Sequence, residues 1–195
     1  MRLHLIFIIF FLFITGCASQ KQSLTVPHPD WKSRLEQQKK WQVAGKLAFI
    51  SPEKRQSANF NWHNQDKSSK LALTTFIGSH VLTLEQFDNH ATLLMKGETH
   101  RAENAQQLLY QLTGMMLPID NAPNWLKGVQ HQSNSEFDQL GRATKGSVIN
   151  QYGQIWHIEY QHFQLIDGLW VPDKLTLSHQ SIKVKIHIYS WQFNL

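Results

Sequence analysis

A two-residue alternation of apolar and polar side chains runs through much of this chain and limits it to a fold built from half-buried strands. It is clearest over 182–189, where isoleucine and valine alternate with lysine, histidine and tyrosine. The same period occurs over 43–49 and 58–62. Because successive side chains of a strand point to opposite faces, each run predicts a strand with one face in a core.

The segments between these runs carry turn and helix signals. Asp88-Asn89 and Lys96-Gly97 predict hairpin turns. A helix is expected over 31–40, with Asp30 as its N-cap, and two more are expected over 103–114 and 122–126. The predicted order is therefore one helix, about six strands, two helices and about five strands.

So many antiparallel strands with few helices make a flat open sheet unfavourable, because its long edges would be exposed. A curved sheet or barrel hides those edges. The chain is therefore predicted to be mainly β, with the helical insert over the open face of a curved antiparallel barrel.

The first 29 residues are typical of an export signal followed by a tether. Met1-Arg2 and the apolar run over 3–14 resemble a secretory signal and are short for a transmembrane span. Residues 14–17, Ile-Thr-Gly-Cys, look like the bacterial lipobox, where cleavage precedes a cysteine that becomes lipid-modified. We expect a signal peptide over 1–16, a lipidated Cys17 with a flexible tether over 17–29, and a single domain over 30–195.

By similarity to bacterial lipoproteins, Ala18 after that cysteine favours the outer membrane, with the domain on its periplasmic face. Cys17 is the only cysteine, so no intramolecular disulfide and no cysteine-based metal site can form. The formal net charge is +5, but the lysines are scattered. No nucleic-acid partner is therefore expected, and anionic lipid or an acidic protein surface is favoured.

Motifs for catalysis are weak in this sequence. Paired carboxylates at a telling spacing are absent, the eleven histidines are dispersed, and no glycine-rich phosphate loop occurs. Ser51 and Lys54 match Ser-x-x-Lys, but they lie in a predicted hairpin turn without the partner motifs of a penicillin-binding site. We interpret them as a solvated turn, and we expect no enzyme, no metal site and no cofactor.

The connection within 71–84 has an apolar tip. Phe76 and Ile77 come just before the expected turning residues Gly78 and Ser79. Turns are usually polar because they face water, and leaving a large apolar side chain exposed forgoes roughly 1.5–3 kcal/mol. Two interpretations remain open: both side chains fold back into the core, or the tip contacts another surface.

Three segments together resemble the LolB family of outer-membrane lipoprotein receptors in Gram-negative bacteria. They are the lipobox ending at Cys17, the block over 73–79, and the spacing from Leu112-Thr113-Gly114 through Pro118 to Trp125-Leu126-Lys127-Gly128. The similarity runs from about Trp41 to the C-terminus. It implies an unclosed antiparallel half-barrel of about eleven strands with a helical lid over a hydrophobic cavity.

The resemblance also implies a function. Such a receptor accepts lipoproteins from the periplasmic carrier LolA by binding their acyl chains, inserts them into the outer-membrane phospholipid, and needs no cofactor. The family's protruding loop carries an exposed hydrophobic residue, which by position is Ile77. Members often have proline before it, whereas this chain has Phe76, which predicts a less rigid loop over 76–78 in which Phe76 shares the role of Ile77.

The cavity of such a half-barrel would be lined from the strands and the lid. The alternation leaves open which strand face points inward, because a slip of one residue exchanges the faces. The candidates for contact with acyl chains are Phe49, Phe60, Trp62, Met115, Met116, Trp125, Trp156 and Ile158. We expect a monomer, and the alternative function is a structural outer-membrane scaffold without a lipid cavity.

Overall fold

The computed structural model of the chain describes residues 26–114 and 116–193. The predicted signal peptide, Cys17 and Met115 lie outside these residues. Within the described part, no helix has both the length and the apolar character needed to cross a bilayer.

The described elements follow the predicted order. The helices are α2 (Trp31–Gln37), α3 (Ala105–Thr113), the short 3₁₀ helix η2 (Ile119–Asn121) and α4 (Ala122–Trp125). The strands are β1 (Trp41–Ile50), β2 (Arg55–Asn64), β3 (Ser68–Thr74), β4 (His80–Phe87), β5 (Ala91–Met95), β6 (Glu98–Ala102), β7 (Glu136–Phe137), β8 (Ala143–Ile149), β9 (Ile155–Ile166), β10 (Leu169–His179) and β11 (Ile182–Phe193).

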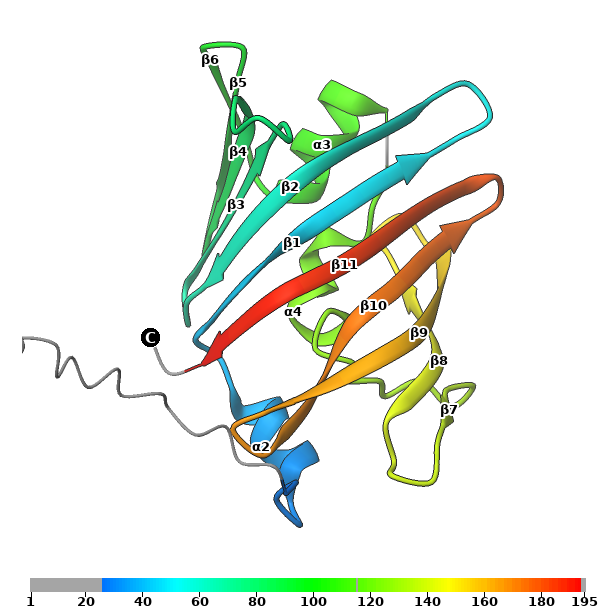
Figure 1. Ribbon diagram of the computed structural model, residues 1–195. Helices are drawn as coiled ribbons and strands as arrows, with labels where there is room; N and C mark the ends of the chain where they lie inside the picture. Colours follow the sequence, from blue (N-terminus) through cyan, green and yellow to red (C-terminus); the bar gives the residue numbers. More distant parts are fainter. Residues whose placement is uncertain (1–25, 115, 194–195) are drawn as a thin grey trace, which may run out of the picture.

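All eleven strands form one antiparallel sheet in the order β6-β5-β4-β3-β2-β1-β11-β10-β9-β8-β7. The sheet curves around the segment between β6 and β7, which carries α3, η2 and α4 and is here called the lid (Figure 1). Because β6 and β7 stand at opposite ends of the order, the barrel is unclosed. The predicted fold class is confirmed.

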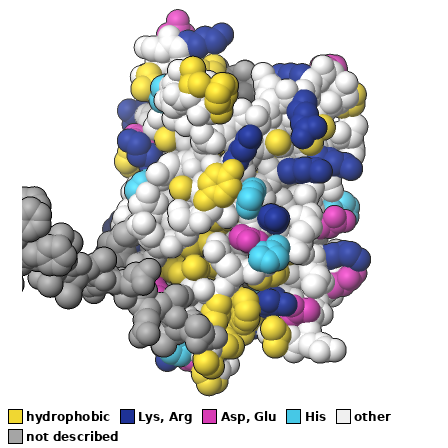
Figure 2. Space-filling model, in the orientation of Figure 1, with side chains coloured by type: hydrophobic (Ala, Val, Ile, Leu, Met, Phe, Trp, Pro, Cys, Tyr) yellow, Lys and Arg dark blue, Asp and Glu magenta, His cyan; other side chains and the backbone are white. Residues whose placement is uncertain are grey.

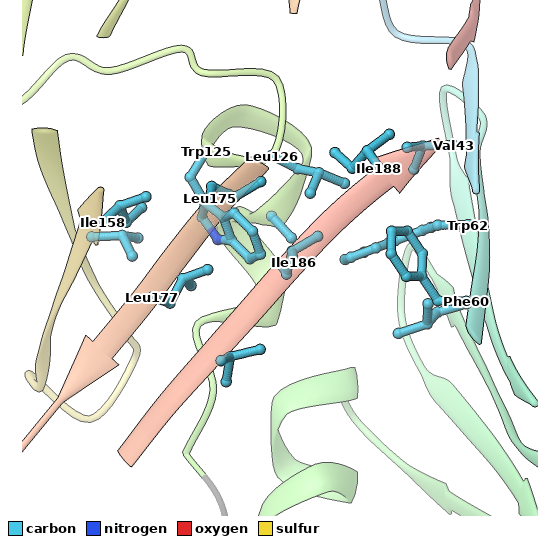
Figure 3. Packing of buried hydrophobic residues seen from close by; sticks show 14 of the residues in the cluster. Val43, Phe60, Trp62, Trp125, Leu126, Ile158, Leu175, Leu177, Ile186 and Ile188 are labelled. Atoms are coloured by element: carbon cyan, nitrogen blue, oxygen red, sulfur yellow. The ribbon is translucent and has the colours of Figure 1, made fainter. Parts of the chain in front are cut away.

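The core fills the concave side of the sheet. Val43 of β1 stands opposite Trp62 of β2 and Trp191 of β11, and all three are buried. Leu175 and Leu177 of β10 continue this inner face, and Trp125 and Leu126 meet it from the lid (Figure 3). The predicted alternation therefore places one face of nearly every strand in a single core.

The alternation breaks at a β-bulge in β11. Ala44 pairs with Ser190 while Gly45 pairs with Ile188, so Tyr189 is the extra residue and is exposed. A Cβ atom at Gly45 would collide with the carbonyl oxygen of His187 and lie 2.9 Å from the Cα of Ile188. Gly45 therefore permits the close approach of β1 and β11 at this bulge.

The first helix differs from the prediction. It ends at Gln37 rather than at residue 40, because Trp41 and Val43 require an extended chain to reach the inner face. Asp30 makes no side-chain cap bond. Its carboxylate instead accepts from Nε of Arg34 at 2.9 and 3.0 Å, and this bond lowers the pKa of Asp30 below its usual value.

The second and third predicted helices are present with shorter bounds, because α3 begins at Ala105 rather than at residue 103 and α4 ends at Trp125 rather than at residue 126. The side chain of Asn104 accepts a hydrogen bond from Gln107 N at 2.8 Å and caps α3, which ends at Gly114 with φ of 68°. The turn at Lys96-Gly97 has the two positive φ angles of a tight hairpin. Contacts with the domain begin at His28, whose N–H donates to the carbonyl of Gly168 at 3.0 Å, two residues before the predicted start of the domain.

Candidate functional site

The connection over 75–79, here called the tip loop, is fully described and projects its apolar residues into solvent. Phe76 is 86% exposed and Ile77 is 72% exposed. Of the two interpretations left open by the sequence, folding back into the core is therefore not the arrangement in this structure.

The turn itself differs from the prediction by two residues. Gly78 N donates to the carbonyl of Thr75 at 3.0 Å, so Phe76 and Ile77 occupy the central positions of a β-turn and Gly78 closes it with φ of 87°. The geometry places the two largest side chains of the loop at its extreme tip.

Thr75 stabilises the loop, although the loop lacks the proline that family members often have at the position of Phe76. Thr75 N donates to the carbonyl of Ser79 at 2.8 Å, and its hydroxyl accepts from Ser79 N at 3.1 Å. The side chain of Asn59 on β2 also donates to the carbonyl of Thr75 at 3.3 Å. These bonds hold the base of the tip loop to the sheet, and nothing in the sequence except the presence of a threonine indicates them.

A bulge enlarges the apolar surface of the loop. Leu73 pairs with Leu82 while Thr74 pairs with His80, so Val81 is the extra residue on β4 and is exposed. The described structure thus presents Phe76, Ile77 and Val81 at one end of β3 and β4.

Five of the predicted cavity candidates lie on the inner face of the sheet. Phe49 on β1, Phe60 and Trp62 on β2, and Trp156 and Ile158 on β9 are all buried in the core cluster. The question of which strand face points inward is thereby answered. Trp125 of α4 faces this core from the lid, whereas Met116 is half-buried and its carbonyl accepts from Asn150 Nδ2 at 2.8 Å.

A cavity of about 470 Å³ enters the concave side at the end of the sheet opposite the tip loop. Its floor is apolar and includes Trp41, Trp62, Leu71 and Leu84, while its rim carries polar and charged side chains from α2 and from the turn after β2. This volume lies within the ~300–1,000 Å³ typical of small-molecule pockets. Deeper in, the candidates pack against one another.

Hydrogen bonds from buried side chains hold the lid to the sheet. The hydroxyl of Tyr160 on β9 donates to the carbonyl of Trp125 at 2.7 Å and accepts from Gln130 Nε2 at 2.7 Å. Burial raises the pKa of the Tyr160 hydroxyl, so this group remains a donor at neutral pH. The indole N–H of Trp125 donates to the carbonyl of Pro118 at 2.9 Å.

Lys127 joins the lid to the first helix. Its side chain is buried at 3% exposure, and Nζ donates to the carbonyls of Leu35 and Gln38 at 3.1 and 3.0 Å. Leu35 lies in the last turn of α2 and Gln38 is its C-cap, so Lys127 adds donors at the end of a helix, where carbonyls run short of helical partners. Burial lowers the pKa of Lys127 to about 8, although the nearby carboxylate of Glu36 acts in the opposite direction.

Ser51 and Lys54 lie in the turn between β1 and β2, where the Ser51 hydroxyl bonds to the backbone of Lys54 and not to its amine. Both residues are solvent-accessible, as expected for a turn. Among the described residues, no group of histidine, cysteine, aspartate and glutamate is arranged to hold a metal ion.

Three structural residues were not singled out from the sequence: Thr75, Lys127 and Tyr160. Tyr160 lies on a recognisable strand, but its bond to the lid joins residues 35 positions apart. Lys127 stands at the unspecified position of the Trp-Leu-x-Gly spacing, and a lysine is usually exposed, so the sequence does not indicate its burial.

Comparisons with known proteins agree with this arrangement. The family model described as "Outer membrane lipoprotein LolB" matches residues 39–191. An outer-membrane lipoprotein LolB of Pseudoalteromonas translucida is 47% identical over 193 residues, covering 99% of this chain and 96% of that protein. The LolB of Aeromonas hydrophila subsp. hydrophila is 35% identical over 182 residues, covering 92% and 91%.

The fold is also found in a solved structure with little sequence similarity. A LolA-superfamily protein from Nitrosomonas europaea has a TM-score of 0.57 at 9% identity, covering 84% of this chain and 93% of that one. This likeness concerns the fold, an unclosed sheet around a helical segment.

Proposed function

The chain belongs to the LolB family of outer-membrane lipoproteins, and on that premise we propose that it receives lipoproteins from the periplasmic carrier LolA and inserts them into the outer membrane. The observation that carries the proposal is the tip loop, which exposes Phe76 and Ile77 on a braced turn. Such a tip is costly in water and suited to the boundary between headgroups and acyl chains.

The apolar interior supports acyl-chain binding. Each methylene removed from water contributes about 0.8 kcal/mol, so a long acyl chain resists crossing the periplasm by roughly 10 kcal/mol. The cavity with Trp41 and Trp62 on its floor offers a place to begin shielding such a chain. Movement of the lid then gives access to the deeper candidates, among them Phe60 and Ile158.

Handover requires only graded affinities. A tenfold preference of this protein over the carrier corresponds to about 1.4 kcal/mol, and the bilayer is a still better environment for the cargo. The proposed activity is therefore transfer without catalysis or cofactor. We further propose that Cys17 carries the lipid anchor, that 17–29 is the tether, and that the protein acts as a monomer on the periplasmic face.

A scaffold without a lipid cavity is the second candidate, and the close packing of Phe49, Phe60 and Ile158 in the core favours it. Displacement of a fluorescent fatty acid separates the two functions. Saturable binding is expected for the receptor, and a protein that binds no acyl chain would be the scaffold.

The decisive experiment substitutes Ile77→Glu and follows a lipoprotein from the carrier into liposomes. At an exposed tip, glutamate should change the free energy of unfolding by no more than about 0.5 kcal/mol, whereas a buried unpaired carboxylate would cost several kcal/mol. We expect the variant to accept cargo and leave it in the aqueous phase, because a charged tip does not enter the acyl boundary. Phe76→Glu should have a similar but milder effect.

Leu140→Glu is the matched control, since Leu140 is 52% exposed in the loop before β8, at the opposite end of the sheet. It should deliver cargo like the parent. Normal delivery by Ile77→Glu, or equal loss in the control, would show that the tip loop is not the insertion element.

A further inference from the structure

The outer face of the sheet carries a group of cations that the proposed function does not use. We call Lys46, Arg55, Lys174, Lys183 and Lys185 the basic face. All five are exposed, and they come from β1, β2, β10 and β11. Figure 2 shows lysine and arginine side chains gathered over this side of the molecule.

The strand register places these cations side by side. Lys46 and Lys174 stand on either side of His187, and Lys185 lies opposite Ala48 on the same face. One row further along, Lys183 and Arg55 flank Ile50. Like charges this close repel unless an anion lies between them.

No described carboxylate supplies that anion. None of the ion pairs among residues 26–114 and 116–193 includes a member of the basic face. The acidic residues nearest in the register are Glu159, which lies opposite Thr176 on the neighbouring strand, and Asp173, which is bound to His162 at 2.6 Å. Both lie at the border of the basic face with β9.

The same face is hollowed. An open depression of about 470 Å³ is lined by Lys46, Lys174, Lys185 and His187, with Gln161 and Thr176 beside them. It offers cationic and neutral hydrogen-bonding groups around one recess, which suits a phosphate group better than a flat array of lysines would.

The basic face lies level with the tip loop. The row that contains Lys174, His187 and Lys46 continues through Asn59 to Thr74, the last residue before the loop. Lys46 is two strands from Thr74, which is about 10 Å at the usual strand spacing. That distance is comparable to the screening length of about 8 Å at physiological ionic strength.

We propose that the basic face binds the headgroup phosphates of anionic phospholipids in the bilayer that the tip loop enters. This inference rests on the proposed function, because it assigns the lipid surface that the tip meets. The apolar tip selects the bilayer, and the basic face biases it toward anionic regions and fixes the tilt of the domain. Lysines on flexible stems suit a surface of many mobile phosphates.

The test follows the tip loop in liposomes that carry the lipid-anchored full chain. Cys17 is the only cysteine and its thiol is taken up by the proposed anchor, so Ser79→Cys provides a single labelling site. Ser79 is exposed and holds the turn through backbone groups. A fluorophore there is quenched by brominated acyl chains when the loop enters the bilayer, in phosphatidylcholine alone or mixed with phosphatidylglycerol.

We expect phosphatidylglycerol to increase insertion of the tip and added salt to reverse the increase. Lys46→Glu with Lys174→Glu should lower the insertion equilibrium roughly tenfold in the mixed vesicles and leave it unchanged in phosphatidylcholine. Lys46→Gln with Lys174→Gln should have an insertion equilibrium between those of the parent and of the charge-reversed variant. It replaces the charge-reversed variant if that protein is too unstable to test. The control Lys40→Glu with Arg101→Glu has the same net charge and places both changes at the end of the sheet away from the tip loop, outside the cavity rim, so it should match the parent.

Insertion that is indifferent to phosphatidylglycerol, or equally reduced in the control, overturns the basic face as a lipid site while leaving the proposed function intact. A tip that enters neither kind of vesicle overturns both. A Lys46→Glu with Lys174→Glu variant that inserts normally but takes cargo slowly from the carrier would assign the face to an acidic protein and overturn the lipid proposal.

Discussion

Lys127 should make the stability of this protein rise with pH in the alkaline range. Its pKa is lowered by burial from 10.5 to about 8 in the folded chain. Between those two values the unfolded chain binds more protons than the folded one, so raising the pH favours folding. Below pH 8 the penalty for burying the ammonium is fully present, and above pH 10.5 it is gone.

The size of the effect follows from the shift. A difference of about 2.5 between the two pKa values corresponds to roughly 3 kcal/mol, because one pKa unit is worth about 1.4 kcal/mol. Lys127 is only 3% exposed, so screening by solvent reduces this free energy little. The neutral amine still has two hydrogens for the carbonyls of Leu35 and Gln38.

The assay compares the parent with Lys127→Met by urea unfolding from pH 7 to pH 10.5. The other titrating groups are common to both proteins and cancel in the difference. We expect the parent to gain about 3 kcal/mol on the variant across this range. Curves that stay parallel would refute the reasoning, and a parent that loses stability relative to the variant would mean that the carbonyls of α2 favour the ammonium more than burial disfavours it.

Two further predictions concern single contacts. Gly45→Ala should lower the free energy of unfolding by about 3 kcal/mol, the upper range for overpacking, since the added Cβ meets the backbone of β11. The control is Gly78→Ala, whose added Cβ meets no atom within 4 Å and which is destabilised only by its positive φ. An equal loss of stability in the two variants would disprove the close approach at Gly45. Tyr160→Phe should lose about 2 kcal/mol, because Nε2 of Gln130 loses its acceptor and the carbonyl of Trp125 keeps only the bond from Gly128 N. The variant should also take up a fluorescent fatty acid faster through a looser lid. Uptake at the parental rate would separate Tyr160 from lid movement.

The strands and their turns were predictable because their signals are local. The alternation over 182–189 and the Lys96-Gly97 turn each depend on neighbours within a few residues, and both are confirmed. The exposure of Phe76 and Ile77 was one of two open interpretations, because sequence does not show whether a loop folds back over its sheet.

What could not be predicted depends on partners far along the chain. The bulges at Val81 and Tyr189 arise from pairing with β3 and β1. The sequence of one strand does not show where its partner has one residue fewer, so these bulges could not be predicted. Asp30 has a capping side chain, but Arg34 one turn later competes for its carboxylate. The burial of Lys127 could not be predicted, because the carbonyls that accept its hydrogen bonds lie 92 and 89 residues away.

The unpaired edges of the sheet give this protein a mechanical property that a closed barrel lacks. The circumference of a closed barrel is fixed by its ring of backbone ladders. Here β6 and β7 are separate edges, and the chain that joins them is the helical segment itself. The sheet can therefore open or tighten around the lid without breaking any hydrogen bond between neighbouring strands. The packing of the core resists such a change, as do side-chain hydrogen bonds such as those from Tyr160 to Trp125 and from Asn150 to Met116.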